Sequence, residues 1–231
     1  MRAVAIIPAA GRGLRMRSAR PKTLMPLLGK PILAWAFDPI IKLGVFSEIL
    51  IACPPEETDS VGGIITEHAS AGAPIRLVTG GKTRQDSVSN GLRAISVDCD
   101  LVAIHDGARP LLTQQLMQDV LDRAKETGAA IAAVPSKDTV KLCSEEGIVS
   151  KTLDRSRVWL VQTPQCFRRD VLVSAYEKAG KDGYLATDDA ALVERAGTPV
   201  HIVMGSYENI KVTTPEDIPI CEEILRRRGI R

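Results

Sequence analysis

The sequence predicts an α/β fold with a doubly wound, mostly parallel sheet and one protruding β-hairpin arm. Apolar runs of strand length alternate with amphipathic runs of helix length, and this alternation predicts the sheet. A break in the alternation after residue 135 predicts the arm. The chain has 231 residues, 45% of them hydrophobic, so it can bury one substantial core, and we expect a single domain over residues 1–231.

Strand and helix segments follow one another in regular order up to residue 135. The apolar run at residues 3–7 is typical of a buried parallel strand. The expected strands are residues 3–8, 48–52, 75–79, 101–105 and 129–135. The expected helices are residues 32–43, 56–71, 84–95 and 113–127. Parallel sheets carry functional loops at the carboxyl ends of their strands, so we expect those loops to hold the site.

Residues 136–156 interrupt this order. Two short alternating segments, 138–143 and 148–153, flank Ser144-Glu145-Glu146-Gly147, which is a hairpin signal. An isolated two-stranded ribbon is barely stable, so we expect this arm to pair with a second subunit.

The order of strands and helices resumes after the arm. Thr214 is the expected N-cap of the last helix, with Pro215 in its first turn. The expected segments are a strand at 158–163, helices at 169–179 and 188–196, strands at 200–204 and 210–213, and a helix at 215–227.

Charge and cysteine content narrow the class of protein. The chain has 30 basic and 28 acidic residues, a balance that argues against a nucleic-acid or membrane-surface binder. Five widely spaced cysteines with no Cys-x-x-Cys pair disfavour both disulfides and a zinc site. No run reaches transmembrane length, and Pro8 and Gly11 interrupt the apolar start, which disfavours a signal peptide. We expect a soluble cytoplasmic enzyme, or a plastid stromal one if the chain is a processed eukaryotic form.

The loop after the first strand concentrates the chemistry of the N-terminal region. Small residues, among them Gly11 and Gly13, let backbone N–H groups approach an anion closely. Cationic side chains, among them Arg15 and Lys22, follow within a few residues. This combination predicts a polyphosphate site.

Two familiar glycine motifs do not fit. Met16 stands where the dinucleotide-binding fingerprint needs its third glycine. Gly81-Lys82-Thr83 resembles the end of a P-loop, but Arg76 stands where that motif needs its first glycine. We therefore exclude both motifs.

Two further loops follow expected strands. Gly81 can bring backbone amides against a base edge, with Arg84 and Ser87 adding hydrogen bonds, although an ordinary turn with a helix cap explains the same residues. Asp106 is placed to hold Mg²⁺, a hard cation that prefers oxygen ligands, or simply to form a turn. His105 is expected to be structural, since attack by a phosphate needs no general base.

The arm and the C-terminal region add two cations. Asp154 is placed to orient Arg155 so that the guanidinium meets a phosphate bidentately, and a solvated ion pair is the alternative. Lys211 ends an expected strand, where its charge faces either the loops already described or solvent.

Individually these signals are weak, but their order and spacing are specific. In chain order they are P-A-A-G-x-G-x-R-M, P-K, G-G-x-x-R-x-x-S-V, H-D-x-A-R-P, D-T-x-K, D-R, T-P-Q, T-D-D/E-A and N-I-K-V-T-x-P-E-D. Together, from about residue 3 to about residue 225, they resemble the 2-C-methyl-D-erythritol 4-phosphate cytidylyltransferase family of isoprenoid biosynthesis. The resemblance implies a Rossmann-like sheet of the nucleotide-diphospho-sugar transferase type. It also implies transfer of a cytidylyl group from CTP to methylerythritol phosphate, with release of pyrophosphate and with Mg²⁺ or another divalent metal as cofactor.

The resemblance further implies a role for each matching residue. The catalytic residues are Arg15, Lys22, Arg155 and Lys211. The nucleotide-binding residues are Ala9, Ala10, Gly11, Gly13, Gly81, Arg84, Ser87 and Asp106, with Asp106 also the metal ligand. The substrate-binding residues are Thr139, Arg155, Arg109, Thr163, Thr187 and Lys211. In the family, the partner subunit's arm supplies the groups matching Thr139 and Arg155, which implies a homodimer with shared sites.

Three positions depart from the family pattern, and two other functions stay open. Thr23, Lys82 and Gly107 replace residues common in relatives, which affects kinetics more than the reaction. A ribitol 5-phosphate cytidylyltransferase shares most of the motifs. A catalytically idle nucleotide-binding module is the other alternative, although the retained cations argue against it.

Overall fold

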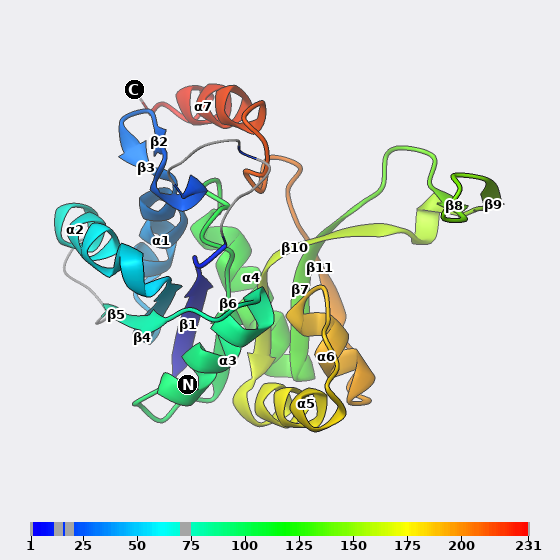
Figure 1. Cartoon of the computed structure of the whole chain (residues 1–231), viewed down its shortest axis with the longest axis horizontal. Coiled ribbons are helices and arrows are strands. Elements are labelled where there is room, and N and C mark those ends of the chain that lie inside the picture. The colour runs from blue at the N-terminus through cyan, green and yellow to red at the C-terminus, as the bar shows by residue number, and fades with distance from the viewer. Residues whose placement is uncertain (1, 12–15, 17–20, 70–74, 231) are drawn as a thin grey trace.

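The computed structural model describes residues 2–11, 16, 21–69 and 75–230. Within them seven strands form one sheet in the order β11-β7-β10-β6-β1-β4-β5 (Figure 1). Only β10 runs antiparallel to its neighbours. The predicted mostly parallel α/β fold is therefore confirmed. The strands are β1 (Ala3–Pro8), β4 (Phe46–Cys53), β5 (Ile75–Thr79), β6 (Leu101–Ile104), β7 (Ala129–Pro135), β10 (Trp159–Arg168) and β11 (His201–Met204).

Helices cover both faces of the sheet because the side chains of each strand alternate between the faces. Ala5 and Ile7 of β1 pack with α1 (Ile32–Leu43), α2 (Thr58–His68) and α4 (Gln114–Thr127). Val4 and Ile6 pack on the other face with α3 (Arg84–Ala94), α5 (Arg169–Asp182) and α6 (Asp189–Arg195). In the described part of the chain, no helix has the length and apolar character needed to cross a bilayer.

The direction of winding changes at β1. The chain runs outward from β1 to β4 and β5, then returns to place β6 on the other side of β1. The loops at the carboxyl ends of these strands diverge at this point, and ligands of open α/β sheets bind in the crevice there. The loops that follow Pro8, Cys53, Thr79 and Ile104 therefore meet at one edge of the sheet.

The expected strand at 210–213 is wrong. These residues form an irregular segment, and the N–H of Val212 donates to the carbonyl of Ala108. Ala108 belongs to a loop, so the apolar alternation of the segment meets no strand edge with which to pair.

The last helix, α7 (Asp217–Arg227), begins two residues later than expected. Thr214 is not its N-cap, because Glu216 occupies that position. The Asp217 carboxylate instead accepts hydrogen bonds from the N–H groups of Thr213 and Thr214, which turns the chain before the helix starts. Figure 1 shows α7 beside the small hairpin of β2 (Pro26–Leu27) and β3 (Lys30–Pro31).

Strand β10 continues five residues beyond its expected end at Thr163. The sequence places Pro164 there, and proline removes a ladder hydrogen bond. The pairing with β7 has a register shift between Val161 and Gln165, and such an irregularity accommodates the proline.

The predicted arm is present as a hairpin of β8 (Lys141–Cys143) and β9 (Val149–Thr152), shorter than expected. Gly147, at φ +81°, donates its N–H to the Ser144 carbonyl and closes the turn. Figure 1 shows the arm extending away from the sheet. Ile148 is 68% exposed, and Leu142 and Val149 are also more than half exposed. The use of the arm in dimerisation stays a prediction. The boundaries of a single domain over residues 1–231 also stay a prediction.

Candidate active site

A pocket of about 950 Å³ opens where the loops after β1, β4, β5 and β6 meet. This volume is typical of a site for a small organic ligand. Pro54, Pro55 and Glu56, which the motif analysis did not assign, form part of the wall. The predicted site residues that line the pocket are Ala9, Ala10, Gly11, Lys22, Gly81, Arg84, Ser87, Asp106 and Lys211.

Two adjacent glycines let the backbone form this wall. A Cβ atom on Gly80 would lie 2.3 Å from the Cβ atom of Ala10. A Cβ atom on Gly81 would lie 2.1 Å from the Cβ atom of Asp86. Any larger residue would therefore push apart the loop after β1, the loop after β5 and the start of α3.

The start of α3 is also an ordinary helix cap. The Thr83 hydroxyl accepts from the Asp86 N–H, and the Asp86 carboxylate accepts from the Thr83 N–H. Ser87 accepts from the Gly81 N–H at 3.0 Å and holds the glycine loop against the helix. The helix-cap interpretation thus holds, and the capped helix start lies on the pocket wall. Contact of these residues with a base stays a prediction.

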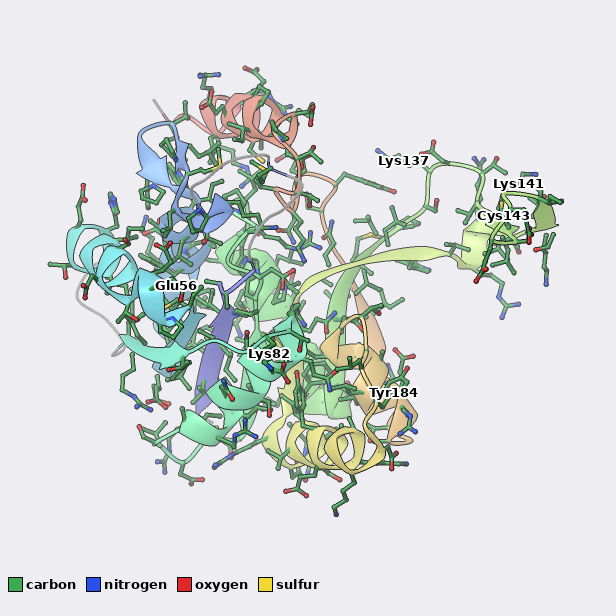
Figure 2. All side chains as sticks on the ribbon, in the orientation of Figure 1. Glu56, Lys82, Lys137, Lys141, Cys143 and Tyr184 are labelled. Atoms are coloured by element: carbon green, nitrogen blue, oxygen red, sulfur yellow. The ribbon has the colours of Figure 1, made fainter. Side chains whose placement is uncertain are left out.

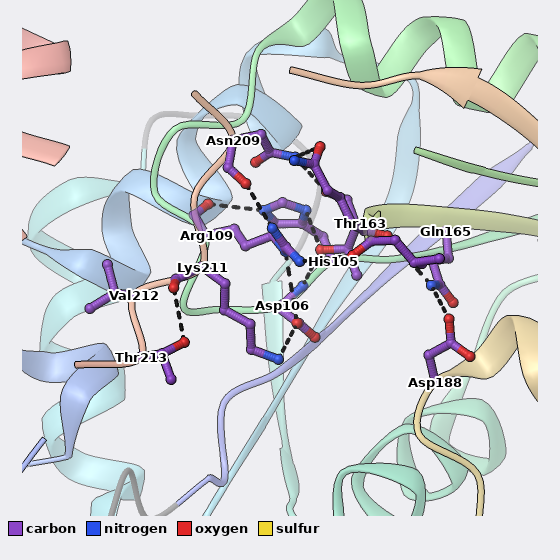
Figure 3. Close-up of polar contacts among 12 residues, drawn as sticks. His105, Asp106, Arg109, Thr163, Gln165, Asp188, Asn209, Lys211, Val212 and Thr213 are labelled. Atoms are coloured by element: carbon purple, nitrogen blue, oxygen red, sulfur yellow. Dashed lines mark hydrogen bonds and ion pairs between the residues drawn. The ribbon is translucent and has the colours of Figure 1, made fainter. Parts of the chain in front are cut away.

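Asp106 is a buried carboxylate among cations (Figure 3). Its Oδ1 atom accepts from Nε of Arg84 at 2.8 Å. Its Oδ2 atom lies 2.7 Å from Nζ of Lys211 and 4.0 Å from Nε of Arg109. Burial by itself raises the pKa of Asp106, but these three positive charges outweigh burial and hold that pKa far below its ordinary value. Asp106 is therefore ionised at neutral pH.

A buried hydrogen-bond chain supports Asp106 from behind. Its N–H donates to Oγ1 of Thr163 at 3.0 Å, and this hydroxyl lies 3.2 Å from Nδ1 of His105. Nε2 of His105 lies 3.1 Å from the carbonyl oxygen of Arg109, which only accepts, so the proton is on Nε2 and the Thr163 hydroxyl donates to Nδ1. Burial lowers the pKa of His105 to about 4. His105 is thus neutral and structural, as the sequence predicts.

Arg109 and Thr163 lie behind Asp106 rather than on the pocket wall. Arg109 is 8% exposed, and its Nη1 donates to the carbonyl oxygen of Asn209 at 2.7 Å. Burial lowers the pKa of Arg109. Asn209 in turn donates from Nδ2 to the carbonyl of Thr163 at 2.8 Å. These residues hold the segment before Lys211 against the sheet.

Lys22 reaches the same wall from the short helix η2 (Lys22–Leu24). Its Nζ donates to the carbonyl oxygen of Val212 at 3.1 Å. Lys22 and Lys211 thus bring two positive charges to one pocket from opposite ends of the chain.

Besides Arg109 and Thr163, three more predicted substrate-binding residues do not line this pocket within one chain: Thr139, Arg155 and Thr187. The first two belong to the arm region. Figure 2 shows Lys141 on the arm, well separated from Lys82 on the pocket wall.

Asp154 does not orient Arg155, so that expectation is wrong. Its carboxylate accepts from the N–H of Ser156 at 3.0 Å and from the Ser156 hydroxyl at 2.7 Å. These donors lie closest in the tight turn η4 (Arg155–Arg157). Nη1 of Arg155 instead donates to the carbonyl oxygen of Lys137 at 2.9 Å.

Other predicted residues fall outside the description or at its edge. Gly13 and Arg15 lie outside the described residues. Of the positions that depart from the family pattern, Thr23 and Lys82 line the pocket, and Gly107 is buried next to Asp106. An exposed extra cation at the wall adds positive charge where a polyphosphate would enter.

Asp189 is the functional candidate that the sequence did not assign. It is 1% exposed, and its Oδ2 atom accepts from Nη1 of Arg84 at 2.7 Å. The sequence offers it only within a T-D-D-A motif at a helix start, where acidic residues usually cap. Asp188 is the actual cap, since it accepts from the N–H of Ala191. Asp189 is therefore available to pair with Arg84.

The described residues contain no group of three or more His, Cys, Asp and Glu side chains that could hold a metal ion. Magnesium in nucleotide sites takes only one or two protein carboxylates, because phosphates and water complete its coordination. Asp106, an ionised carboxylate on the pocket wall, fits that requirement as a single oxygen ligand.

The fold and pocket together define a nucleotidyltransferase-type α/β enzyme, with glycine backbone, two lysines and a carboxylate at its switch point. The family model of IspD, 2-C-methyl-D-erythritol 4-phosphate cytidylyltransferase, matches residues 3–227. The Syntrophus aciditrophicus protein of that name is 44% identical over 97% of this chain and 96% of the relative. Its Caldanaerobacter subterraneus counterpart is 40% identical over 98% of this chain and 100% of the relative.

Solved structures agree with the sequence comparisons. The crystal structure of 4-diphosphocytidyl-2C-methyl-D-erythritol synthase from Anaerococcus prevotii superposes with a TM-score of 0.86. It is 33% identical and covers 97% of this chain and 98% of that one. This chain belongs to the 2-C-methyl-D-erythritol 4-phosphate cytidylyltransferase family, and the resemblance inferred from the motifs is confirmed.

Proposed function

We propose that this chain transfers the cytidylyl group of CTP to 2-C-methyl-D-erythritol 4-phosphate and releases pyrophosphate. One observation carries the proposal: Lys22, Asp106 and Lys211, from three distant segments, line one pocket with a glycine backbone wall. The relatives' names describe this activity.

In the proposed reaction an oxygen of the methylerythritol phosphate attacks the α-phosphorus of CTP. The bond from that phosphorus to the bridging oxygen breaks, and its electron pair leaves with pyrophosphate. Negative charge builds on the α-phosphate oxygens in the transition state, and fixed cations stabilise it. We assign this role to Lys22 and to Arg15, and we assign the methylerythritol phosphate to Lys211.

The glycine side of the pocket is proposed to hold the nucleoside. A tight wall around Ala9, Ala10, Gly81 and Ser87 suits a pyrimidine better than a purine. Asp106 is proposed to lie near the ribose and to hold Mg²⁺, which when bound would neutralise charge on the phosphates.

The arm is proposed to complete the site in a homodimer. Thr139 and Arg155 lie outside the pocket of their own chain, and exposed apolar residues such as Ile148 suit a protein interface. In this arrangement the partner subunit's arm brings its cation to the polyol phosphate. The cytoplasmic location likewise stays a prediction.

The decisive experiment measures pyrophosphate release from CTP and Mg²⁺, with methylerythritol 4-phosphate and ribitol 5-phosphate in parallel tubes. We expect release with the first sugar phosphate alone. Release with ribitol 5-phosphate alone would overturn the substrate but keep the chemistry. A CTP-specific rise in melting temperature without turnover would favour the idle module.

A further inference from the structure

A chain of buried polar contacts runs from the core to the pocket. The hydroxyl of Tyr176, on α5, donates to Oδ1 of Asp189, at the start of α6. Oδ2 of Asp189 accepts from Nη1 of Arg84 at 2.7 Å, and Nε of Arg84 donates to Oδ1 of Asp106 at 2.8 Å. Each carboxylate oxygen of Asp189 thus has one donor, so this side chain has a single well-defined orientation.

Arg84 is shared between two carboxylates. Burial opposes the charge of this guanidinium, but Asp189 and Asp106 outweigh burial and raise the pKa of Arg84. Its third nitrogen, Nη2, is buried with no hydrogen-bond partner among the residues that the structure describes. An unsatisfied buried donor destabilises a fold, and the contacts with the two carboxylates offset that cost.

The second carboxylate changes what Arg84 does to the first. Nη1 of Arg84 contacts Asp189 while Nε contacts Oδ1 of Asp106, so the two carboxylates fix the guanidinium plane from two sides. The other oxygen of Asp106 faces Lys211 at 2.7 Å. Without Asp189, only the contact with Asp106 remains, and the guanidinium can rotate about it toward the other oxygen of Asp106, in competition with Lys211.

We propose that Asp189, fixed by Tyr176, is a positioning residue for CTP binding, because it holds Arg84 edge-on to Asp106 at the pocket wall. This inference rests on the proposed nucleotide site but needs no particular polyol phosphate. Asp189 acts entirely through Arg84, since Asp189 itself does not line the pocket.

Neighbouring contacts tie the same two segments together. Gln85 donates from Nε2 to the carbonyl oxygen of Tyr184 and accepts from the N–H of Ala186. The start of α3 is thus docked against the α5–α6 loop by two consecutive side chains, Arg84 and Gln85. Removing the Asp189 charge therefore leaves the docking in place and alters mainly the guanidinium.

The test measures CTP affinity by calorimetry in the full chain, with Mg²⁺ and without any polyol phosphate. Asp189→Asn keeps the shape and an acceptor for Arg84 but removes the charge, and we expect CTP to bind about tenfold more weakly. Tyr176→Phe keeps the charge and frees the carboxylate, and we expect a loss of about threefold. Asp188→Asn, which changes the adjacent carboxylate and retains the helix cap, is the matched control and should bind CTP as the wild type does.

A double-mutant cycle separates positioning from general damage. In Arg84→Gln protein, the additional Asp189→Asn change should alter CTP affinity by no more than about twofold, because its effect passes through Arg84. Equal losses in both backgrounds, or wild-type affinity in Asp189→Asn, would overturn the inference. If a variant of this pair does not fold, unchanged affinity in Tyr176→Phe would overturn it. Wild-type protein that binds no CTP would instead overturn the nucleotide site. CTP binding without turnover in the pyrophosphate assay would overturn the proposed reaction and leave this inference in place.

Discussion

Nζ of Lys22 donates to the carbonyl oxygen of Val212 at 3.1 Å, across 190 positions of sequence. This contact joins the segment after β1 to the segment before α7, immediately beside Lys211. Arg228, just after α7, donates from Nη2 to a carboxylate oxygen of Glu208 at 2.9 Å and so ties α7 to the segment that carries Lys211. The positions of both pocket lysines thus depend on the docking of the C-terminal region.

Lys22→Ala is expected to reduce kcat about 10²–10³-fold, the usual effect of removing a group that stabilises transition-state charge. Steady-state pyrophosphate release measures it. Lys42→Ala, which removes an exposed lysine that pairs with Asp38, is the control and should leave kcat unchanged. Near-normal kcat in Lys22→Ala would remove this lysine from the mechanism.

Thr163→Val is expected to destabilise the protein by about 2 kcal/mol, because it orphans the buried N–H of Asp106 and Nδ1 of His105. Urea unfolding at pH 7 measures the change. Thr163→Ser retains the hydroxyl and should recover most of the loss. Equal stability of the valine and serine variants would show that the hydroxyl contributes nothing.

Stability is expected to fall on acidification through His105. Its pKa is about 4 in the folded state, below the ordinary value of 6.5, so the unfolded chain binds a proton first as the pH falls. The loss therefore begins near pH 6.5 and is complete near pH 4, and amounts to about 2 kcal/mol between pH 7 and pH 5. His105→Gln, which keeps one donor and one acceptor, should lose less over that range. Urea unfolding of both proteins at pH 7 and pH 5 measures the two losses. Equal losses of unfolding free energy would contradict a role for His105.

Shared active sites predict complementation between two inactive variants. Lys22→Ala and Arg155→Ala should each be inactive alone. After random subunit exchange, half of the dimers are mixed and each has one intact site of two, so about a quarter of the sites should recover. Mass spectrometry of mixed dimers verifies the exchange. No recovery in exchanged protein would exclude a site that needs both subunits.

The sheet was predictable because strand and helix signals are local. The strands of residues 3–8, 75–79 and 129–135 have the expected bounds. The first and the last are continuous apolar runs, and residues 75–79 are a short β-branched segment ended by glycines. Residues 210–213 carry a similar local signal but meet no strand edge, so the prediction failed there. At Pro164 the error was the opposite one: the strand was expected to end at Thr163, but β10 continues to Arg168 because an irregular pairing accommodates the proline.

The site was predictable where the residue type by itself indicates the chemistry. The glycines and Asp106 follow strands, and together with Lys22 and Lys211 they indicate phosphate and metal binding. Gly11, Gly81, Lys22, Asp106 and Lys211 line a single pocket. Arg109 was expected beside the substrate but is buried behind Asp106. The local sequence does not distinguish a loop arginine that faces solvent from one that faces the core.

The sequence by itself determined the order of strands and helices, the loops that carry charge, and the family. These depend on side-chain periodicity and on residue type at fixed spacing, which are properties of short segments. Only the tertiary structure decided that Asp189 pairs with Arg84, 105 positions away, and that Lys22 meets Val212. Such pairings arise because a charged group that loses water on burial needs a partner from another segment. A local sequence pattern does not specify which segments will meet.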